Sequence, residues 1–111
     1  MRNIDSLKNT SQFKEVYENG SSIANHLLVL YALPVDGDDK KLGISVSKKV
    51  GNSVVRHRVT RIIRESFVKL APELPAGYRF VVVARVHAKG KNFSDIYGAL
   101  LYLCRKINLV K

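Results

Sequence analysis

Eight of the nineteen Lys and Arg residues lie between Lys40 and Arg64, a stretch of 25 residues that contains no acidic residue. This stretch carries +8 of the chain's net charge of +10, and the other 86 residues are close to neutral. Such a concentration of positive charge attracts polyanions. Half of the eight side chains are guanidinium groups, which bind phosphate oxygens in a bidentate manner and stack on bases. The pattern predicts a nucleic-acid-binding surface, although charge alone does not separate RNA from DNA or from an anionic membrane.

A long amphipathic helix is expected to present this charge, from Asn52 to about Leu70. At about 100° per residue, its apolar side consists of Val59, Ile62, Ile63, Phe67 and Leu70. The nearly opposite side consists of His57, Arg61 and Arg64. Like charges at this spacing repel by roughly a few tenths of a kcal/mol per pair, and Glu65 is the only acid in the helix. We therefore interpret the basic side as a binding surface; the alternative is an ordinary solvated helix face.

The start of this helix offers a second anion-binding feature. Gly51, Asn52 and Ser53 precede the first turn, where backbone N–H groups lack partners within the helix. Lys48 and Lys49 lie directly before it and enlarge the positive patch. An anion site and a plain N-cap are equally consistent with these residues, and both can hold at once.

Three aromatic residues lie outside the basic stretch. Phe13 and Tyr17 share one face of a short predicted helix, and Tyr31 falls late in a predicted strand. Single-stranded nucleic acid is commonly held by stacking of its bases on such side chains beside a basic groove. The competing interpretation is that each ring belongs to the hydrophobic core.

The sequence shows no grouping of residues that would let the protein itself catalyse hydrolysis. Asp36, Asp38 and Asp39 form the only close acidic cluster, on a Gly-containing loop that lacks the later bidentate Glu of a calcium-binding EF-hand. The three His residues are scattered, and Cys104 is the single cysteine, which excludes an internal disulfide and a Cys-rich zinc site. We expect no catalytic residue and no metal ligand in this chain.

The remaining patterns predict a single α+β domain over residues 1–111. The first helix has a Ser/Thr cap within residues 9–11 and ends at Gly20, and the last helix is capped by residues 92–95. The last helix carries one buried stripe, formed by Ile96, Ala99, Leu100, Leu103 and Ile107. Strands are expected at residues 27–33, 42–47 and 80–84, with a possible short one at 22–25. The order α-β-β-(β)-α-β-α indicates a two-layer α/β sandwich with a small mixed sheet.

Two further expectations concern location. Met1 is followed by polar residues, unlike a secretory signal, and the longest apolar run, residues 27–33, is too short to span a bilayer. We therefore expect a cytoplasmic protein without a membrane partner.

The stretch from Ser45 to Phe67 closely resembles the arginine-rich motif of the protein subunit of bacterial ribonuclease P. In one-letter code this stretch reads SVSKKVGNSVVRHRVTRIIRESF. The resemblance extends to residues 13–17, Gly20, residues 24–25 and residues 29–31 in order and spacing, and to residues 82–85 in a later strand. It therefore spans nearly the whole chain.

The resemblance implies a protein that assembles with a catalytic RNA to remove the 5′ leader of precursor tRNA. The expected hydrolysis uses Mg²⁺ held by the RNA subunit and substrate, and the implied fold contains a left-handed βαβ crossover. The residues implied to contact the catalytic RNA are Lys48, Lys49, Asn52, Arg56, His57, Arg58, Arg61 and Arg64. The implied cleft for the single-stranded leader is formed by Phe13, Tyr17 and Tyr31.

Two positions depart from the family pattern. His57 stands where the Arg-Asn-Arg core normally has Asn, and Thr60 where Lys or Arg is common. Imidazole still donates hydrogen bonds and stacks, whereas Thr60 suggests weaker phosphate contact. The N-terminal arm offers only Arg2 and Lys8.

Two other classes of protein compete with this assignment. The first is a structural RNA-binding protein such as a ribosomal component. The second is a DNA-binding module, for which the recognition helix and dimer seam are missing from the sequence. We therefore expect no DNA partner.

Overall fold

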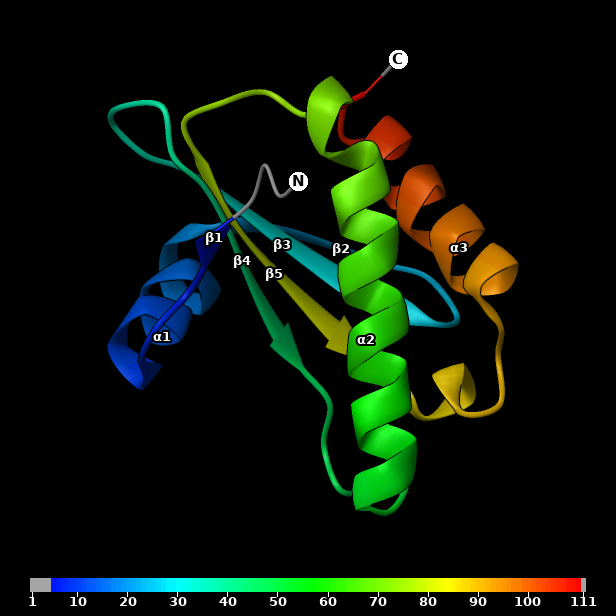
Figure 1. Cartoon of the computed structure of the whole chain (residues 1–111). Coiled ribbons are helices and arrows are strands. Elements are labelled where there is room, and N and C mark those ends of the chain that lie inside the picture. The colour runs from blue at the N-terminus through cyan, green and yellow to red at the C-terminus, as the bar shows by residue number, and fades with distance from the viewer. Residues whose placement is uncertain (1–4, 111) are drawn as a thin grey trace.

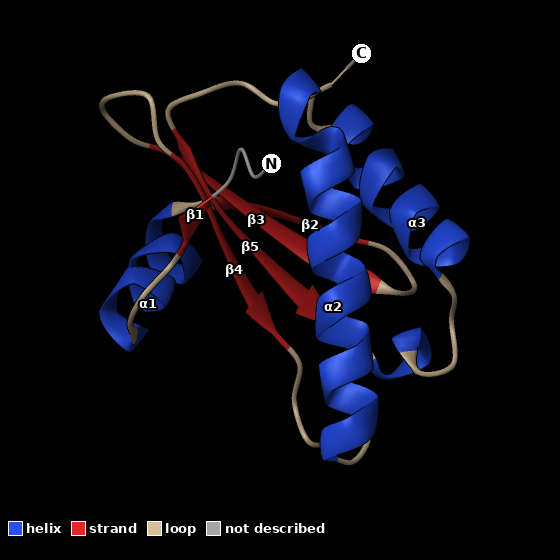
Figure 2. Ribbon diagram, viewed as in Figure 1, coloured by secondary structure: helices blue, strands red, loops and turns tan. Residues whose placement is uncertain are grey.

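The computed structural model describes residues 5–110, so Arg2 of the N-terminal arm lies outside the described residues. The strands are β1 (Asp5–Ser6), β2 (Ser21–Ala24), β3 (Leu28–Pro34), β4 (Lys40–Ser45) and β5 (Tyr78–Ala84). The helices are α1 (Thr10–Asn19), α2 (Ser53–Leu70) and α3 (Phe93–Lys106), with short 3-10 helices η1 (Ala71–Glu73) and η2 (Val86–Ala88). Figure 2 shows the helices arranged around one central sheet. The possible strand near residues 22–25 is present as β2.

Two local predictions need correction, and one strand was missed. The cap of α1 is Asn9, not Ser or Thr, because the Asn9 side-chain oxygen accepts the Gln12 N–H at 3.0 Å. Strand β4 begins at Lys40 rather than residue 42 and ends at Ser45, where its pairing with β5 stops opposite Val83. Strand β1 was not predicted, because two residues are too short to show a periodicity.

The five strands form one mixed sheet in the order β1-β4-β5-β3-β2. Strand β4 pairs in parallel with β5, whereas β3 pairs antiparallel with both β5 and β2. In Figure 1, α2 lies in front of the sheet, β4 and β5 both run downward, and β5 lies to the right of β4. The β4–α2–β5 crossover is therefore left-handed, against the strong right-handed preference of such units. This agrees with the expectation drawn from the family resemblance.

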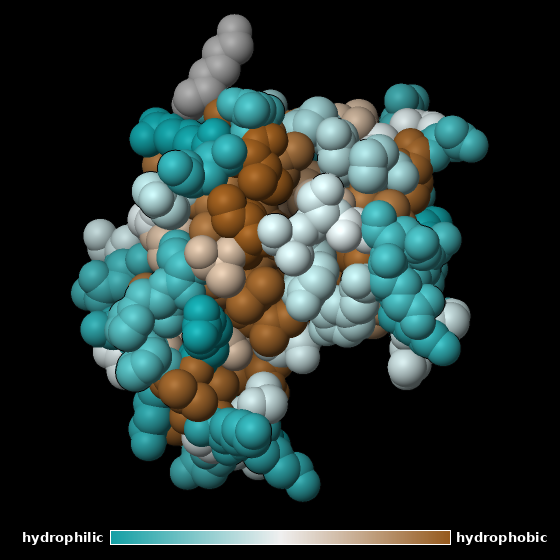
Figure 3. All heavy atoms as spheres, turned by 180° about the vertical axis from the view of Figure 1, so that it is seen from behind, coloured by the Kyte–Doolittle hydropathy of each residue, from teal (hydrophilic) through white to brown (hydrophobic). Residues whose placement is uncertain are grey.

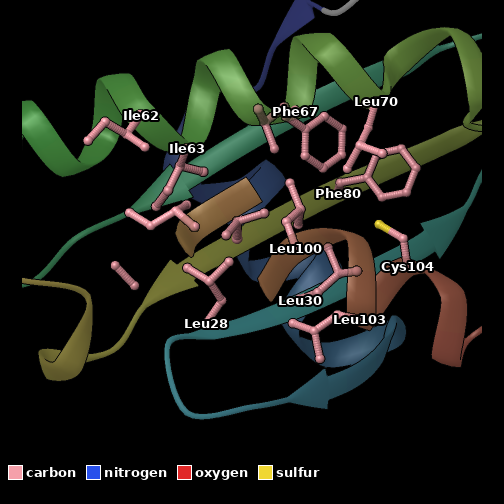
Figure 4. Close-up of a cluster of buried hydrophobic side chains, with 14 of the residues drawn as sticks. Leu28, Leu30, Ile62, Ile63, Phe67, Leu70, Phe80, Leu100, Leu103 and Cys104 are labelled. Carbon is pink, nitrogen blue, oxygen red and sulfur yellow. The ribbon is translucent and has the colours of Figure 1, made fainter. Parts of the chain in front are cut away.

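The main core lies between the sheet and the pair α2 and α3 (Figure 4). Alternate residues of β3 and β5 point into it, and both helices contribute the apolar stripes expected from their sequences. The rings of Phe67 in α2 and Phe80 in β5 lie 5.1 Å apart at its centre. Ala99 and Ile107 of the predicted α3 stripe are only half-buried. This packing holds α2 against the sheet and leaves its basic side outward.

Helix α1 packs on the opposite face of the sheet and adds a partial third layer. Its buried Val16 contacts a small cluster with Leu7 and Val81. An ion pair at its edge joins Arg79 Nη1 of β5 to Glu15 Oε1 of α1 at 2.8 Å. Because α1 covers only part of this face, the neighbouring strands remain accessible beside it.

Burial of Cys104 in the main core leads to a prediction about pH. Desolvation raises the pKa of the Cys104 thiol from 9.0 to about 12. The folded state therefore keeps a proton that the unfolded chain loses near pH 9.0. The thiol's contribution to stability is complete below that pH and declines above it, by about 2 kcal/mol at pH 10.5. Urea unfolding from pH 8 to 10.5 should show a steeper loss for the wild type than for Cys104→Ala; parallel curves would contradict the assignment.

Candidate RNA-binding surface

The N-terminus of α2 is held by a side-chain cap. The Asn52 side-chain oxygen accepts the Val55 N–H at 3.0 Å, which confirms the N-cap interpretation. Gly51 leaves room for this turn, since a Cβ at that position would lie 2.7 Å from the Val55 side chain. Lys48 and Lys49 are exposed directly before it. The cap uses one Asn52 oxygen, and anion binding at this end of α2 stays a prediction.

The basic side chains of α2 spread around the exposed half of the helix. His57 and Arg61 are exposed, and Val59, Ile63 and Phe67 are fully buried, which confirms the predicted separation of the two sides. We use the name basic surface for the exposed Lys, Arg and His side chains of this region and their half-buried neighbour, namely Lys48, Lys49, His57, Arg58, Arg61 and Arg64.

Three arginines of α2 make contacts that the sequence did not predict. Arg56 is half-buried, and its Nη1 donates to the Gly51 carbonyl at 3.1 Å, so it braces the loop before the helix. Arg64 Nη1 donates to the Ser6 hydroxyl of β1 at 3.2 Å. Arg58 Nη1 donates to the Lys91 carbonyl, before α3, at 3.0 Å. Each contact ties α2 to a different neighbour: the loop before it, β1, or the segment before α3. The contacts therefore hold the three guanidinium groups in place along the helix.

Thr60 also lies away from the outermost part of the helix. Its hydroxyl donates to the Arg56 carbonyl at 2.8 Å, one turn earlier. The hydroxyl is thus satisfied within α2. The position contributes no charge to the basic surface, in line with the weaker phosphate contact expected there.

The positive charge of the basic surface is not compensated by neighbouring acids. Within residues 5–110, the ion pairs are Lys14–Glu18, Lys41–Asp39 and Arg79–Glu15, none of which involves α2. Lys40, which begins the basic stretch, has a structural contact instead, since its Nζ donates to the Ala71 carbonyl at 2.8 Å. The uncompensated charge therefore sits on α2 and the segment before it, where it can attract a polyanion.

The three predicted aromatic residues meet beside α1. Tyr17 and Tyr31 are in edge-to-face contact, with ring centroids 4.9 Å apart, and Phe13 lies 6.4 Å from Tyr17. Tyr17 is 39% exposed, whereas Phe13 and Tyr31 are half-buried. We call this group of three rings the aromatic cleft, after the leader cleft that the family resemblance implies. Figure 3, which views the molecule from behind, shows a band of apolar surface across this face, flanked by hydrophilic side chains.

Strand β4 connects the aromatic cleft to the basic surface. The Phe13 ring lies on Gly43. A Cβ at position 43 would lie 2.5 Å from the ring, so glycine is the residue that lets the ring approach the strand this closely. Ser45 follows on the same side of the strand, paired with Val83 of β5. Lys48 comes three residues later. Strand β4 therefore leads from the position beneath the Phe13 ring to the segment that carries Lys48 and Lys49.

The structure also brings together side chains that looked scattered in the sequence. His26 and His87 stack with ring centroids 4.1 Å apart at the end of the sheet. Their separation of about sixty residues gave no signal of this contact.

In the part of the chain that the structure describes, no three His, Cys, Asp or Glu side chains are grouped to hold a metal ion. Among the same residues, none of the helices combines the length and apolar character needed to cross a membrane.

A mixed α/β sandwich with a left-handed crossover, an uncompensated basic helix and an adjacent aromatic cleft defines a small protein with surfaces suited to RNA. The family model of Ribonuclease P matches residues 1–108. The chain belongs to the family of ribonuclease P protein components, whose role is the 5′ maturation of tRNA.

Individual relatives agree with this assignment. The ribonuclease P protein component of Lachnoclostridium phytofermentans is 52% identical over 101 residues, covering 91% of this chain and 87% of the relative. The RNase P protein of Staphylococcus aureus superposes with a TM-score of 0.87 at 33% identity, covering 96% of this chain and 97% of that one. The RNase P protein from Thermotoga maritima gives a TM-score of 0.83 at 25% identity, covering 92% and 96%.

Proposed function

We propose that this chain assembles with the catalytic RNA of ribonuclease P through the basic surface and holds the 5′ leader of precursor tRNA in the aromatic cleft. The observation that carries the proposal is that β4 leads from Gly43, beneath the Phe13 ring, to the segment of Lys48 and Lys49 at the start of α2. An RNA bound to α2 would place a single strand lying in the cleft next to the catalytic RNA. The protein would thus act as a bridge between the enzyme RNA and its substrate, in the cytoplasm.

The contacts within the basic surface suggest different roles for its members. Lys48, Lys49, His57 and Arg61 are exposed and free to meet phosphates. Arg58 and Arg64 are each tethered through one guanidinium nitrogen, and their other N–H groups can still donate to phosphate oxygens. Arg56 and Asn52, both expected to contact RNA, are used in shaping the start of α2. We expect their substitution to act mainly by displacing Lys48 and Lys49.

The leader proposal rests on the chemistry of the aromatic cleft. The rings of Tyr17 and Tyr31 contact each other edge to face beside an apolar strip of the sheet. Stacking on such rings tolerates any base, which suits a substrate class whose leaders differ in sequence. The DNA alternative is disfavoured, because α2 is packed against the sheet and α3 rather than projecting as a recognition helix.

The chemistry itself is assigned to the RNA. The described carboxylates and imidazoles do not fit a protein-held divalent ion. Mg²⁺, when bound, would supply the activated water and charge stabilisation of phosphodiester hydrolysis from sites on the RNA subunit and substrate. The part of this chain would be to neutralise phosphate repulsion and to orient the leader.

A salt titration tests the basic surface. If about six basic residues in and beside this surface each meet a phosphate, log Kd for a bacterial ribonuclease P RNA should change with log salt concentration with a slope of about 4 to 5. Arg61→Ala should reduce that slope by about one, and Arg64→Ala by a similar amount. Arg61→Lys is the matched control, because it keeps the charge and should keep the slope. An unchanged slope in both alanine variants would mean that this side of α2 faces solvent in the complex.

A further inference from the structure

A second aromatic group lies on the other side of the molecule, at the rim between α2 and α3. The rings of Phe93 and Tyr97 in α3 are stacked, with centroids 5.6 Å apart and planes 11° from parallel. Phe93 is 37% exposed, although it begins a helix whose aliphatic side chains mostly face the core. We call this pair the α3 platform. It is separate from the aromatic cleft, because α1 and α3 cover opposite faces of the sheet.

Basic residues of α2 lie beside the α3 platform and beside the segment that leads into it. Lys69 Nζ lies 5.6 Å from the centre of the Tyr97 ring. Arg58 donates to the carbonyl of Lys91, only two residues before Phe93. The segment before α3 adds Lys89 and Lys91 and no acid, whereas its Arg85 and His87 contact the loop before β3. An arginine of the basic surface is therefore joined directly to the backbone that leads into the α3 platform.

Two carboxylates lie near this rim. The Asp95 side chain accepts the Asn92 N–H at 3.3 Å in the capping box of α3, so it is engaged in holding the helix start. Glu65 is exposed on α2, one turn before Lys69, and forms no ion pair within residues 5–110. Both carboxylates would oppose a polyanion, and Glu65 is the one of the two that is not engaged in a helix cap.

We propose that the α3 platform is a stacking site for an unpaired base of the catalytic RNA, and that it extends the RNA interface from the basic surface across Arg58 onto α3. This inference rests on the proposed function, because it assumes that the arginines of α2 meet that RNA. Stacked aromatic rings with ammonium and guanidinium groups beside them match a base and its flanking phosphates. A protein partner bound at the same place would need carboxylates to complement Lys69, Lys89 and Lys91.

Substitutions of Phe93 separate stacking from packing. Phe93→Leu keeps apolar bulk at the start of α3 but removes the ring, and it should weaken binding of a bacterial ribonuclease P RNA by about 5- to 150-fold. Phe93→Tyr keeps the ring and should bind as the wild type does. The salt slope should be the same in all three proteins, because a lost stack releases no counterions. Tyr102→Ala is the matched control, since Tyr102 is 52% exposed on α3 and, nine residues after Phe93, lies on nearly the opposite side of the helix.

Charge substitutions at the same rim give an independent readout. Lys69→Ala should lower the salt slope by about one, whereas Glu65→Gln should raise the affinity. If Phe93→Leu keeps the wild-type melting temperature and also the wild-type RNA affinity, the α3 platform is not a stacking site. That conclusion holds even if Arg61→Ala lowers the slope as expected. An unchanged slope in Arg61→Ala would instead count against the basic surface. The two failures are thus distinguishable in one set of titrations.

Discussion

Tyr17→Ala is expected to weaken binding of precursor tRNA to the assembled enzyme by about 1–3 kcal/mol, the loss of one base stack. Mature tRNA has no leader, so its affinity should hardly change. Tyr17 is the best of the three cleft positions for this test, because it is 39% exposed and its loss leaves the small α1 core intact. The measurement is the ratio of precursor to mature tRNA affinity in the assembled enzyme.

Controls for this prediction follow from the packing of the cleft. Truncation of the half-buried Phe13 or Tyr31 can cost about 3–5 kcal/mol of stability, so only variants with an unchanged melting temperature are informative. Tyr17→Phe and Tyr31→Phe keep the rings and should retain the ratio. Tyr102→Ala removes an exposed tyrosine on the far side of the sheet and should also leave it unchanged. A wild-type ratio in all three alanine variants of the cleft would show that the rings serve the core alone.

The purified protein without RNA is expected to cleave no precursor tRNA at any Mg²⁺ concentration. Within residues 5–110, no group of three acidic, His or Cys side chains could hold a metal ion. Cys104 cannot act as a nucleophile near neutral pH, because it is buried and its pKa is raised to about 12. The assay uses labelled precursor tRNA with Mg²⁺, after exhaustive ribonuclease treatment and repurification of the protein.

One result would reverse this assignment of the chemistry. Cleavage that survives the ribonuclease treatment and disappears in a variant lacking Asp36, Asp38 and Asp39 would place hydrolysis in the protein. Lys41→Ala is a suitable control for that variant, because Lys41 forms the ion pair with Asp39 and its loss perturbs the same loop without removing a carboxylate.

The elements with strong periodicity were predictable from sequence. The buried stripe of α2 and its cap at Asn52 appear as expected, because eighteen residues give several turns over which apolar positions recur. The same holds for α3, where Asn92 and Asp95 complete a capping box. The outward direction of His57 and Arg61 followed from the same period.

Features that depend on tertiary contacts were not predictable in this way. The left-handed crossover contradicts the general preference and was expected only from the family resemblance. The tethering of Arg56, Arg58 and Arg64 depends on which loops lie beside α2, and no local pattern contains that information. The α3 platform was hidden because Phe93 and Tyr97 have the spacing of ordinary core residues, and only their exposure marks them as different.

The central claim is that the protein joins catalytic RNA and substrate by neutralising their phosphates. The most direct measurement is the rate of precursor tRNA cleavage by a bacterial ribonuclease P RNA at low Mg²⁺, with and without this protein. Protein cations should replace part of the screening that high Mg²⁺ otherwise provides. We predict that cleavage at low Mg²⁺ depends on the protein, and that Arg61→Ala and Tyr17→Ala each reduce its effect. Equal rates with and without the protein, at RNA and protein concentrations where the complex forms, would contradict the account.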